Sequence, residues 1–331
     1  MPQVTVYDVA ESAKVSIATV SRALNSPEKV NEATRARVLA AIDRLGYVPK
    51  AEAAARARKD HGRIGVLAPF LTYPSFVQRL RGVATALCDS PYELVVYYVD
   101  SLARLEGYLA SLTVTRRLDG LILMALPMSA GGAHRLLSAG IEAVLVEHAS
   151  QNLNSIEIDD VAGGRLAAEY LISLGHRRLG FIGDAELPDY AIRNSERRLM
   201  GYRAAIENAG YALPEAYVGL AAHGVEPARK QTHRLLALPE PPTAIFAHSD
   251  TQAMGILKAA RERSLNVPRD LAVIGFDDVD IADFVGLTTI HQPLEESGRV
   301  AVDLLLARLA NPSRPPQHIT LPLTLVRRET A

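Results

Sequence analysis

The chain has 331 residues, a net charge of −1 and 48% hydrophobic residues, which is an ordinary composition for a folded protein. This is more residues than a single hydrophobic core usually serves, so we expect two or three domains. The single cysteine, Cys88, excludes an intrachain disulfide framework and a cysteine-based metal site, and we expect its thiol to be buried in a helix.

No apolar run approaches the roughly 18 to 20 residues that a membrane span requires, and no signal segment opens the sequence. We therefore expect a cytoplasmic protein with no membrane partner. Residues 1–60 carry ten Lys or Arg and seven Asp or Glu, whereas the remainder carries 26 and 30. A basic N-terminal module on a slightly acidic body suits a polyanionic partner at that end.

Residues 5–45 have the pattern of three helices with short connections. Thr5 can cap the first helix, with Asp8 three residues later as in a capping box. Ser16 can cap the second helix and Asn31 the third. Two short helices across a tight turn, completed by a third, predict an all-α helix-turn-helix headpiece.

The second of these helices, in the stretch KVSIATVSRALN, separates its apolar positions from the rest. At about 100° per residue, one face gathers Ile17, Ala18, Ser21, Arg22 and Asn25. A purely structural surface helix more often carries Glu and Lys on its free face. Small residues, hydroxyls, one Arg and one Asn instead fit against groove edges and phosphates, so this face predicts contact with DNA.

The stretch KAEAAARARKD, residues 50–60, is rich in alanine and has almost nothing large to bury. It is either a plain helical linker or a segment that gains order on DNA, because a solitary helix this short is marginal in water.

From Arg63 onward, apolar runs alternate with amphipathic helices, which indicates parallel sheets covered on both faces. More strands are expected than one sheet usually takes, so we predict two doubly wound lobes that divide near IDDVAGG, residues 158–164. Ligands bind beyond the carboxyl ends of such strands, in the cleft between lobes. The expected strands are 63–69, 93–99, 120–126, 142–148, 155–160, 178–184, 243–249, 271–277 and 287–292.

Several motifs together resemble the lactose-repressor/galactose-repressor (LacI/GalR) family of bacterial transcription regulators. They include VTVYDVAESAKVSIATVSRALN, VNEATRARVLAAIDRLGYVP, RRLMGYRAAI, AIFAHSD and LAVIGFDD, and the similarity covers essentially the whole chain in order. The resemblance implies a homodimer or larger assembly, a palindromic operator and a core like that of periplasmic sugar-binding proteins. It implies a headpiece over residues 1–48, a hinge over 49–61 and a core over 62–331, with an N-lobe of about 62–160 and 292–322 and a C-lobe of about 161–291 and 323–331.

The resemblance also implies DNA-contacting residues in the headpiece and hinge. Residues that match base-reading positions of the family are Ile17, Ala18 and Arg22, and the Arg22 fork suits guanine O6 and N7. Further DNA-binding candidates, mostly for the backbone, are Thr5, Ser16, Thr19, Ser21, Asn25, Lys50, Ala53 and Arg56.

The hinge departs from the family pattern at one position. The family usually places a Leu where this chain has Arg56, and that Leu inserts into the minor groove at the operator centre. Arg56 can instead lie in a narrow, A·T-rich minor groove. Either the centre is read without a kink or a neighbouring residue takes the place of the Leu.

For the effector site, the resemblance points to Arg198 in RLMGY and Asp277 in GFDD. A guanidinium and a carboxylate placed across a cleft satisfy the donors and acceptors of a polyol, whereas the plain alternative is an interdomain salt bridge. Ser249 stands where sugar-binding relatives often have Asn. The aromatic candidates, for which core packing is the alternative, are Tyr73 and Phe76, and more weakly Phe70 and Phe284.

No cofactor or metal ion is expected. The DDVDIADF stretch lacks the Gly-centred loop and the terminal Glu of a calcium site, and His148, His176 and His291 lack metal-ligand spacing. The expected effector is a mono- or disaccharide, with a purine or another small metabolite as the alternative.

The sequence therefore predicts a ligand-responsive, sequence-specific DNA-binding regulator, a repressor of sugar metabolism genes, and not an enzyme. A solute-binding protein for transport is disfavoured by the headpiece. A sugar-active enzyme is disfavoured because no paired acid and base can be assembled. The effector, the operator sequence and the direction of the response stay open. The absence of a further heptad-patterned helix after RRETA favours a dimer over a tetramer.

Overall fold

The computed structural model describes residues 4–25, 29–45, 47, 62–115, 117–185 and 188–331. The chain forms two compact units, a small one of residues 1–63 with 91–93 and a large one that holds the rest. Within the described residues, no helix is long and apolar enough to cross a membrane.

The small unit contains the three expected headpiece helices, α1 (Val6–Ala13), α2 (Ile17–Asn25) and α3 (Glu32–Leu45). Each helix contributes small apolar side chains to one core, namely Val9, Ala10, Ala13, Val20, Ala23, Val38 and Ala41. Because one face of each short helix is used in this way, the opposite face of α2 remains available to a partner.

The caps expected for the first and third helices are confirmed. The Thr5 backbone N–H and hydroxyl both donate to Asp8 Oδ2 at 2.7 Å. Asn31 Oδ1 accepts from the Thr34 backbone N–H at 2.8 Å. These bonds satisfy N–H groups that a helix start would otherwise leave without a partner.

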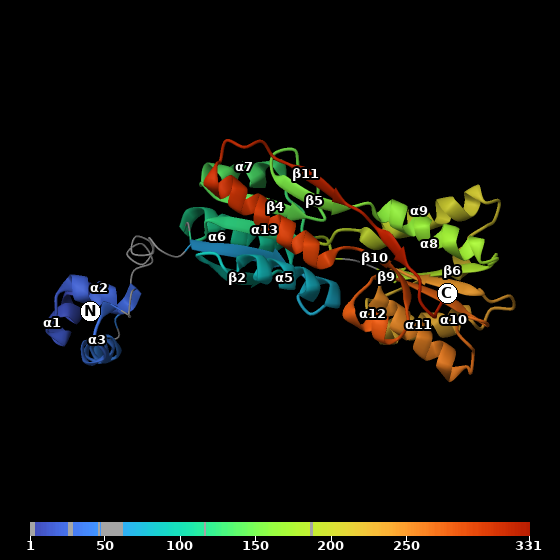
Figure 1. Ribbon diagram of the computed structural model, residues 1–331, viewed down its shortest axis with the longest axis horizontal. Coiled ribbons are helices and arrows are strands. Elements are labelled where there is room, and N and C mark those ends of the chain that lie inside the picture. Colours follow the sequence, from blue (N-terminus) through green and yellow to red (C-terminus); the bar gives the residue numbers. More distant parts are fainter. Residues whose placement is uncertain (1–3, 26–28, 46, 48–61, 116, 186–187) are drawn as a thin grey trace. The chain divides into compact units, whose positions relative to one another are not determined.

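The large unit consists of two α/β lobes (Figure 1). The described strands of the first lobe pair in the order β11-β5-β4-β3-β1-β2. They are β1 (Gly62–Ala68), β2 (Tyr92–Tyr98), β3 (Gly120–Met124), β4 (Glu142–Val146), β5 (Asn154–Ile158) and β11 (His318–Leu321). The helices of this lobe are α5 (Pro74–Leu87), α6 (Leu102–Thr115), α7 (Ala130–Ser138) and α13 (Leu294–Ala310).

The second lobe repeats this plan in the order β12-β10-β9-β8-β6-β7, with β12 antiparallel to β10. Its described strands are β6 (Leu179–Asp184), β7 (Val218–Ala221), β8 (Ala244–Ala247), β9 (Ala272–Asp277), β10 (Thr288–His291) and β12 (Thr324–Val326). Its helices are α8 (Asp160–Ser173), α9 (Asn194–Asn208), α10 (Val225–Leu235), α11 (Asp250–Glu262) and α12 (Asp280–Phe284), with a 3-10 turn η2 (Glu215–Tyr217).

In the described part of the chain, the polypeptide crosses between the lobes three times. The crossings lie between β5 and α8, between β10 and α13, and between β11 and β12. Connections of this kind allow two lobes to close on a ligand as nearly rigid bodies.

All nine expected strands are present, and three short strands, β7, β11 and β12, were not expected. The expectation for Cys88 is wrong, because this cysteine is exposed. It is the C-cap residue of α5 and directly follows the buried Leu87, so at about 100° per residue its side chain points away from the direction of Leu87.

A close helix pair carries a buried arginine in each lobe. In the first lobe, α5 packs on α13, and a Cβ on Gly298 would overlap the Arg79 carbonyl oxygen. In the second lobe, α9 packs on α8, and a Cβ on Gly164 would overlap the Arg198 carbonyl oxygen. Only glycine permits these close backbone approaches, which fix the position of each arginine.

Candidate functional site

The predicted DNA-contacting face of α2 lies opposite its buried residues. Ile17, Ala18 and Arg22 are exposed, whereas Val20 and Ala23 are buried in the headpiece core. Ile17 is 39% exposed, so its side chain is accessible to a partner on this face.

The other headpiece candidates support the start of the helices. Ser16 Oγ accepts from the Thr19 backbone N–H at 3.2 Å and lies 2.9 Å from the Thr19 hydroxyl, so Ser16 caps α2 as expected. Thr5 is exposed and caps α1, and Ser21 is half-buried. Four candidates lie outside the described residues, the Asn25 side chain and the hinge residues Lys50, Ala53 and Arg56.

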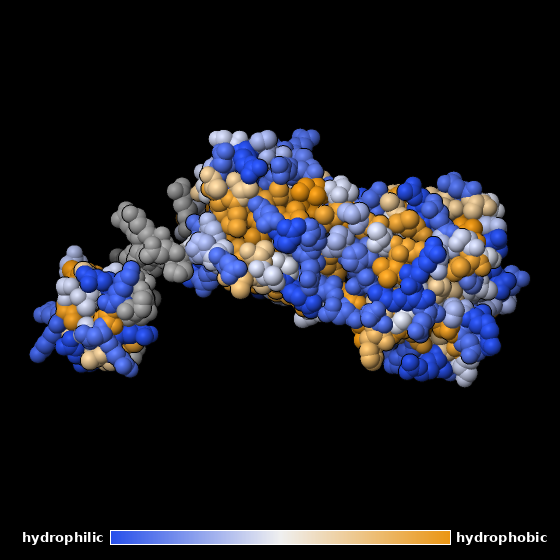
Figure 2. Space-filling model, viewed as in Figure 1, coloured by the Kyte–Doolittle hydropathy of each residue, from blue (hydrophilic) through white to orange (hydrophobic). Residues whose placement is uncertain are grey.

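A cavity of about 70 Å³ lies between the two lobes of the large unit, at the carboxyl ends of their strands. Six of the seven effector candidates line it, Phe70, Tyr73, Phe76, Arg198, Ser249 and Asp277. Phe284 does not, because α12 directs it to the surface, where it is 85% exposed. On the face of the lobes seen in Figure 2, hydrophilic and hydrophobic residues are mixed, and one exposed aromatic side chain is not unusual on such a surface.

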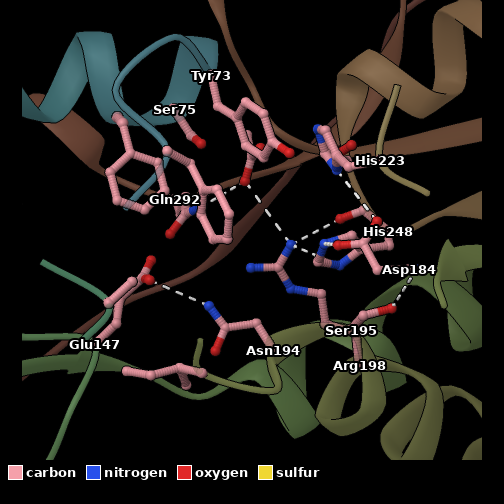
Figure 3. Close-up of a pocket in the computed structure, with 16 residues that line it drawn as sticks. Tyr73, Ser75, Glu147, Asp184, Asn194, Ser195, Arg198, His223, His248 and Gln292 are labelled. Atoms are coloured by element: carbon pink, nitrogen blue, oxygen red, sulfur yellow. Dashed lines mark hydrogen bonds and ion pairs between the residues drawn. The ribbon is translucent and has the colours of Figure 1, made fainter. Parts of the chain in front are cut away.

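Arg198 lies on α9 at the base of this cavity (Figure 3) and is 2% exposed. Its Nε donates to Asp160 Oδ1 at 2.8 Å, and its Nη1 donates to the His248 carbonyl oxygen at 2.7 Å. Nη1 also lies 3.8 Å from Asp277 Oδ1, and the guanidinium stacks on Phe276 at 3.5 Å from the ring centroid. The arginine is therefore held rigidly, with one face covered by a ring.

Asp277 ends β9 with a positive φ of 112° and points into the same cavity. Gln292 Nε2 donates to its Oδ1 at 2.5 Å. Burial raises the pKa of the Asp277 carboxyl to about 6, although the Arg198 charge opposes this rise. We expected Arg198 and Asp277 to face each other across the cleft, but both belong to the second lobe, so this expectation is wrong.

Ser249 lines the cavity next to this pair but also has a structural role. It is the N-cap of α11, and its Oγ accepts from the Gln252 backbone N–H at 3.3 Å. A ligand can therefore use the O–H donor and the one remaining lone pair of this hydroxyl.

Two histidines and an aspartate that the sequence reading did not select also lie in the cavity. Asp184 ends β6, and His223 and His248 follow the neighbouring strands β7 and β8. His223 Nδ1 lies 3.2 Å from Asp184 Oδ1, and His248 Nε2 lies 3.1 Å from Asp184 Oδ2. The available signal was a polar residue directly after each of three apolar runs, in GFIGD, GLAAH and IFAHS.

The charges of this triad follow from its surroundings. Burial alone would raise the pKa of Asp184, but hydrogen bonds from His223 and His248 lower it well below its usual range. Burial, together with the Arg198 charge, lowers the pKa of His248 to about 4. At neutral pH, Asp184 is therefore ionised and His248 is neutral.

The three side chains are close enough to hold a metal ion, since their ligand atoms lie within 4.8 Å of one another. However, His248 Nδ1 lies 3.3 Å from Arg198 Nη1, which can only donate a hydrogen bond. A metal ion on Nε2 would place a proton on Nδ1, facing the guanidinium, whereas metal-bound histidines normally donate that proton to an acceptor. The geometry favours a hydrogen-bonded triad over a metal site.

Aromatic rings form the opposite wall of the cavity. Phe70 and Tyr73, which follow β1, stack with 4.9 Å between centroids and 7° between planes. Phe76 meets Phe70 edge-on at 5.8 Å. Tyr73 stacks in turn on His223 of the second lobe at 4.3 Å and 18°, so this contact closes the cleft.

Glu147, which follows β4, also lines the cavity and was not expected there. Its Oε1 accepts from Arg79 Nη2 at 2.6 Å, and its Oε2 accepts from Asn194 Nδ2 at 3.1 Å. Arg79 belongs to the first lobe and Asn194 to the second, so Glu147 joins the two lobes.

Comparisons with known proteins agree with both parts of this description. Residues 5–50 match the model of bacterial regulatory proteins of the lacI family, and residues 168–331 match the periplasmic binding protein-like domain. The chain is 36% identical to the HTH-type transcriptional repressor CytR of Escherichia coli (strain K12) over 92% of this chain and 89% of CytR. It is 33% identical to the ribose operon repressor of the same strain over 99% of both chains.

Two solved structures show the same architecture. A LacI family regulator from Enterococcus faecium with bound ribose is 27% identical, with a TM-score of 0.71 over 81% of this chain and 98% of that chain. The lac repressor dimer bound to operator and the anti-inducer ONPF is 28% identical, with a TM-score of 0.72 over 99% of both chains. The chain therefore belongs to the lacI family of bacterial regulatory proteins and is a DNA-binding transcription regulator, not an enzyme.

Proposed function

We propose that the cavity between the lobes binds a small polyhydroxylated effector, a mono- or disaccharide, and that this binding controls operator binding by the headpieces of a homodimer. The regulator is then a repressor of sugar metabolism genes whose occupancy on DNA follows the level of that sugar. Relatives with bound ribose and with bound operator support the two halves of this proposal.

The observation that carries the proposal is the position of Arg198 and Asp277. Their side chains lie 3.8 Å apart and line one cavity, so a donor fork and an acceptor stand side by side. A sugar hydroxyl both donates and accepts, so it can bridge the two groups. The Tyr73 and Phe70 rings on the opposite wall can cover the apolar face of the sugar ring.

The size of the cavity indicates how such a ligand enters. Its volume of about 70 Å³ is below the roughly 150 Å³ of an engineered cavity that holds benzene. A sugar therefore requires the lobes to part or the Tyr73 ring to leave His223, followed by closure around the ligand. The coupling to DNA is limited by the preference of the effector for one state, typically about 1 to 3 kcal/mol.

A purine is the second candidate, and the Tyr73–His223 stack favours it. The two rings come from different lobes and are nearly parallel at 4.3 Å. If the lobes part by one ring thickness, a flat heterocycle can take the place of that contact and stack on both faces.

Calorimetric titration of D-ribose and of adenine into the full-length protein distinguishes these candidates. We expect ribose to bind the wild type and Asp277→Ala to weaken binding at least about tenfold, as loss of a hydrogen bond to a charged group does. Asp278→Ala is the matched control, because Asp278 pairs with His291 and Arg328 instead of lining the cavity. Binding of adenine alone would overturn the carbohydrate proposal, and undiminished ribose binding by Asp277→Ala would show that the site is misplaced.

DNA binding by the headpiece is tested with Arg22→Ala. If Arg22 reads a guanine, this variant loses about 1 to 3 kcal/mol of discrimination at one base pair of each half-site. Arg37→Ala is the control, because Arg37 lies on α3 and donates to Thr34 at 3.2 Å. Retardation of a palindromic operator and its single-base variants measures the difference, and an unchanged base preference in Arg22→Ala would contradict the assignment.

A further inference from the structure

We propose that Asp184 and His248 are positioning residues that orient Arg198 toward the effector, and that His223 links this orientation to the Tyr73 ring of the other lobe. The proposal rests on the function proposed above, since it gives Arg198 the role of ligand contact. It adds a chain of contacts, which we call the relay, running from Tyr73 through His223, Asp184 and His248 to Arg198 (Figure 3).

The first step of the argument concerns the tautomer of His248. Arg198 Nη1 lies 3.3 Å from His248 Nδ1, and a guanidinium has only donors, so Nδ1 must carry the lone pair. The proton of the neutral ring is then on Nε2, where it donates to Asp184 Oδ2 at 3.1 Å. Each partner of His248 therefore requires the same tautomer, and the ring is held from both sides.

The second step concerns the donors of Arg198. Nε is engaged by Asp160, and Nη1 by the His248 carbonyl oxygen and imidazole. This arrangement leaves Nη2 as the donor that a ligand can engage. If the His248 imidazole is lost, Nη1 keeps its bond to the backbone carbonyl of residue 248 and Nε keeps Asp160, but the second donor of Nη1 is released, so the guanidinium loses one of the three hydrogen bonds that fix its orientation.

The third step concerns Asp184, which joins the two histidines. Its Oδ1 accepts from Gln252 Nε2 at 2.9 Å and lies 3.2 Å from His223 Nδ1. With Nδ1 directed at Asp184, the face of the His223 ring is presented to Tyr73 at 4.3 Å. A shift of Asp184 therefore changes the Tyr73–His223 stack, which is a contact between lobes.

Three substitutions at two positions isolate the relay. His248→Phe keeps the ring volume and removes the two side-chain hydrogen bonds, to Arg198 and to Asp184, while the backbone carbonyl of residue 248 still accepts from Arg198 Nη1. His248→Gln retains them, because one amide can accept from Arg198 through its oxygen and donate to Asp184 through its nitrogen. His176→Phe is the matched control, since His176 also makes a hydrogen bond in the second lobe, to Thr243 at 3.0 Å, but does not line the cavity.

The first measurement needs no ligand. Nitrogen-15 NMR of the full-length protein with labelled histidine is expected to show His248 as the Nε2–H tautomer at neutral pH. Detection of the Nδ1–H tautomer would overturn the relay. Stoichiometric binding of Zn²⁺ that removes the Nε2–H signal would also overturn it, in favour of a metal site.

The second measurement reports on the stack. The chain contains no tryptophan, so Tyr73→Trp provides a single tryptophan beside His223, whose emission can be excited selectively over that of the tyrosines. Combined with Tyr73→Trp, His248→Phe is expected to shift the emission, while His248→Gln and His176→Phe leave it close to that of the Tyr73→Trp parent. Equal emission from all of these proteins would show that His248 and the stack are not linked.

The third measurement is D-ribose affinity by calorimetry in the native Tyr73 background. We expect His248→Phe to weaken binding at least about tenfold and His248→Gln to stay within about threefold of the wild type. Equal losses in both variants would mean that His248 has only a packing role. A wild type that does not bind ribose counts against the proposed effector, and the relay is then decided by the NMR and fluorescence results.

Discussion

Each lobe contains a buried arginine beside a close helix crossing, and the same four-residue pattern, Arg-Leu-x-Gly, encodes it in both. RLRG, residues 79–82 on α5, and RLMG, residues 198–201 on α9, each place a buried arginine one turn before a glycine at a close helix crossing. The first arginine, however, is engaged by Ser297 and Glu147 behind the cavity, whereas the second lines the cavity itself. The two arginines thus occupy corresponding positions on their helices but have different roles.

The difference lies in the carboxylates that each arginine meets. Arg79 meets Glu147, whose other oxygen reaches Asn194 of the second lobe, so this pair holds the lobes together. Arg198 meets Asp160 on the neighbouring helix α8, and Asp277 stands farther away at 3.8 Å. Asp160 on the adjacent helix anchors Nε and His248 engages Nη1, so Nη2 of the fork remains available to a ligand.

Removing each arginine is the most severe test of this comparison. Arg79→Met and Arg198→Met each leave a buried carboxylate without its partner, so each should lower the free energy of unfolding by about 3 to 5 kcal/mol. Only Arg198→Met should also abolish effector binding. Urea unfolding and ribose calorimetry measure the two effects, and the double variant Arg79→Met with Glu147→Gln should recover most of the lost stability. If Arg79→Met and Arg198→Met lost ribose binding equally, the proposed difference between the two arginines would be wrong.

The glycine crossings provide a test of intermediate size. Gly298→Ala in the first lobe and Gly164→Ala in the second each place a Cβ against backbone, and we expect a loss of about 1 to 3 kcal/mol from either. Gly107→Ala is the control, because Gly107 lies within α6 with open space around it, and should gain about 0.5 to 1 kcal/mol. Thermal unfolding distinguishes the expected loss of stability at the two crossings from the expected gain at Gly107. A stabilising effect at either crossing would show that the helices can move apart freely.

The last test concerns pH, and two groups of the second lobe should act in opposite directions. The pKa of Asp277 is raised from 3.8 to about 6, so its contribution to stability is present below pH 4 and is lost as the pH rises toward 6. The pKa of His248 is lowered from 6.5 to about 4, so its contribution is present above pH 6.5 and is lost as the pH falls toward 4.

Unfolding of Asp277→Asn and His248→Gln between pH 4 and 7 measures these contributions. Relative to the wild type, Asp277→Asn should make stability rise more steeply with pH, and His248→Gln should make it rise less steeply. Parallel curves for the wild type and both variants would contradict the two shifts.

Much of the fold followed from local sequence patterns. Apolar runs identified nine of the twelve described strands, and capping residues such as Thr5 and Asn31 identified the headpiece helices. The strands β7, β11 and β12 were not expected, because short stretches such as HITL and TLV mix polar and apolar residues and do not stand out as apolar runs. Their place in the sheets depends on pairing with neighbours that are distant in the chain.

Sequence reasoning predicted the cavity less completely than it predicted the fold. Arg198 and Asp277 followed from the family resemblance, whose implied lobe bounds already place both in the second lobe, at odds with the expectation that they face each other across the cleft. The aromatic residues followed from their position after the first expected strand of the first lobe. His223, His248 and Glu147 were not expected, because each is a single polar residue after an apolar run. Such residues come together only when parallel strands align their carboxyl ends, so their proximity is a property of the sheet order.

The three crossings also have a mechanical consequence. Three separate connections between the same two lobes limit sliding and twisting more than one connection does, so opening and closing of the cleft is the movement we expect. Gln292 lies in one of these connections and donates to Asp277 at the base of the cavity. A ligand in the cavity lies close to a connection between the lobes. A displacement of a fraction of an ångström at the cavity therefore becomes a larger displacement at the far ends of the lobes.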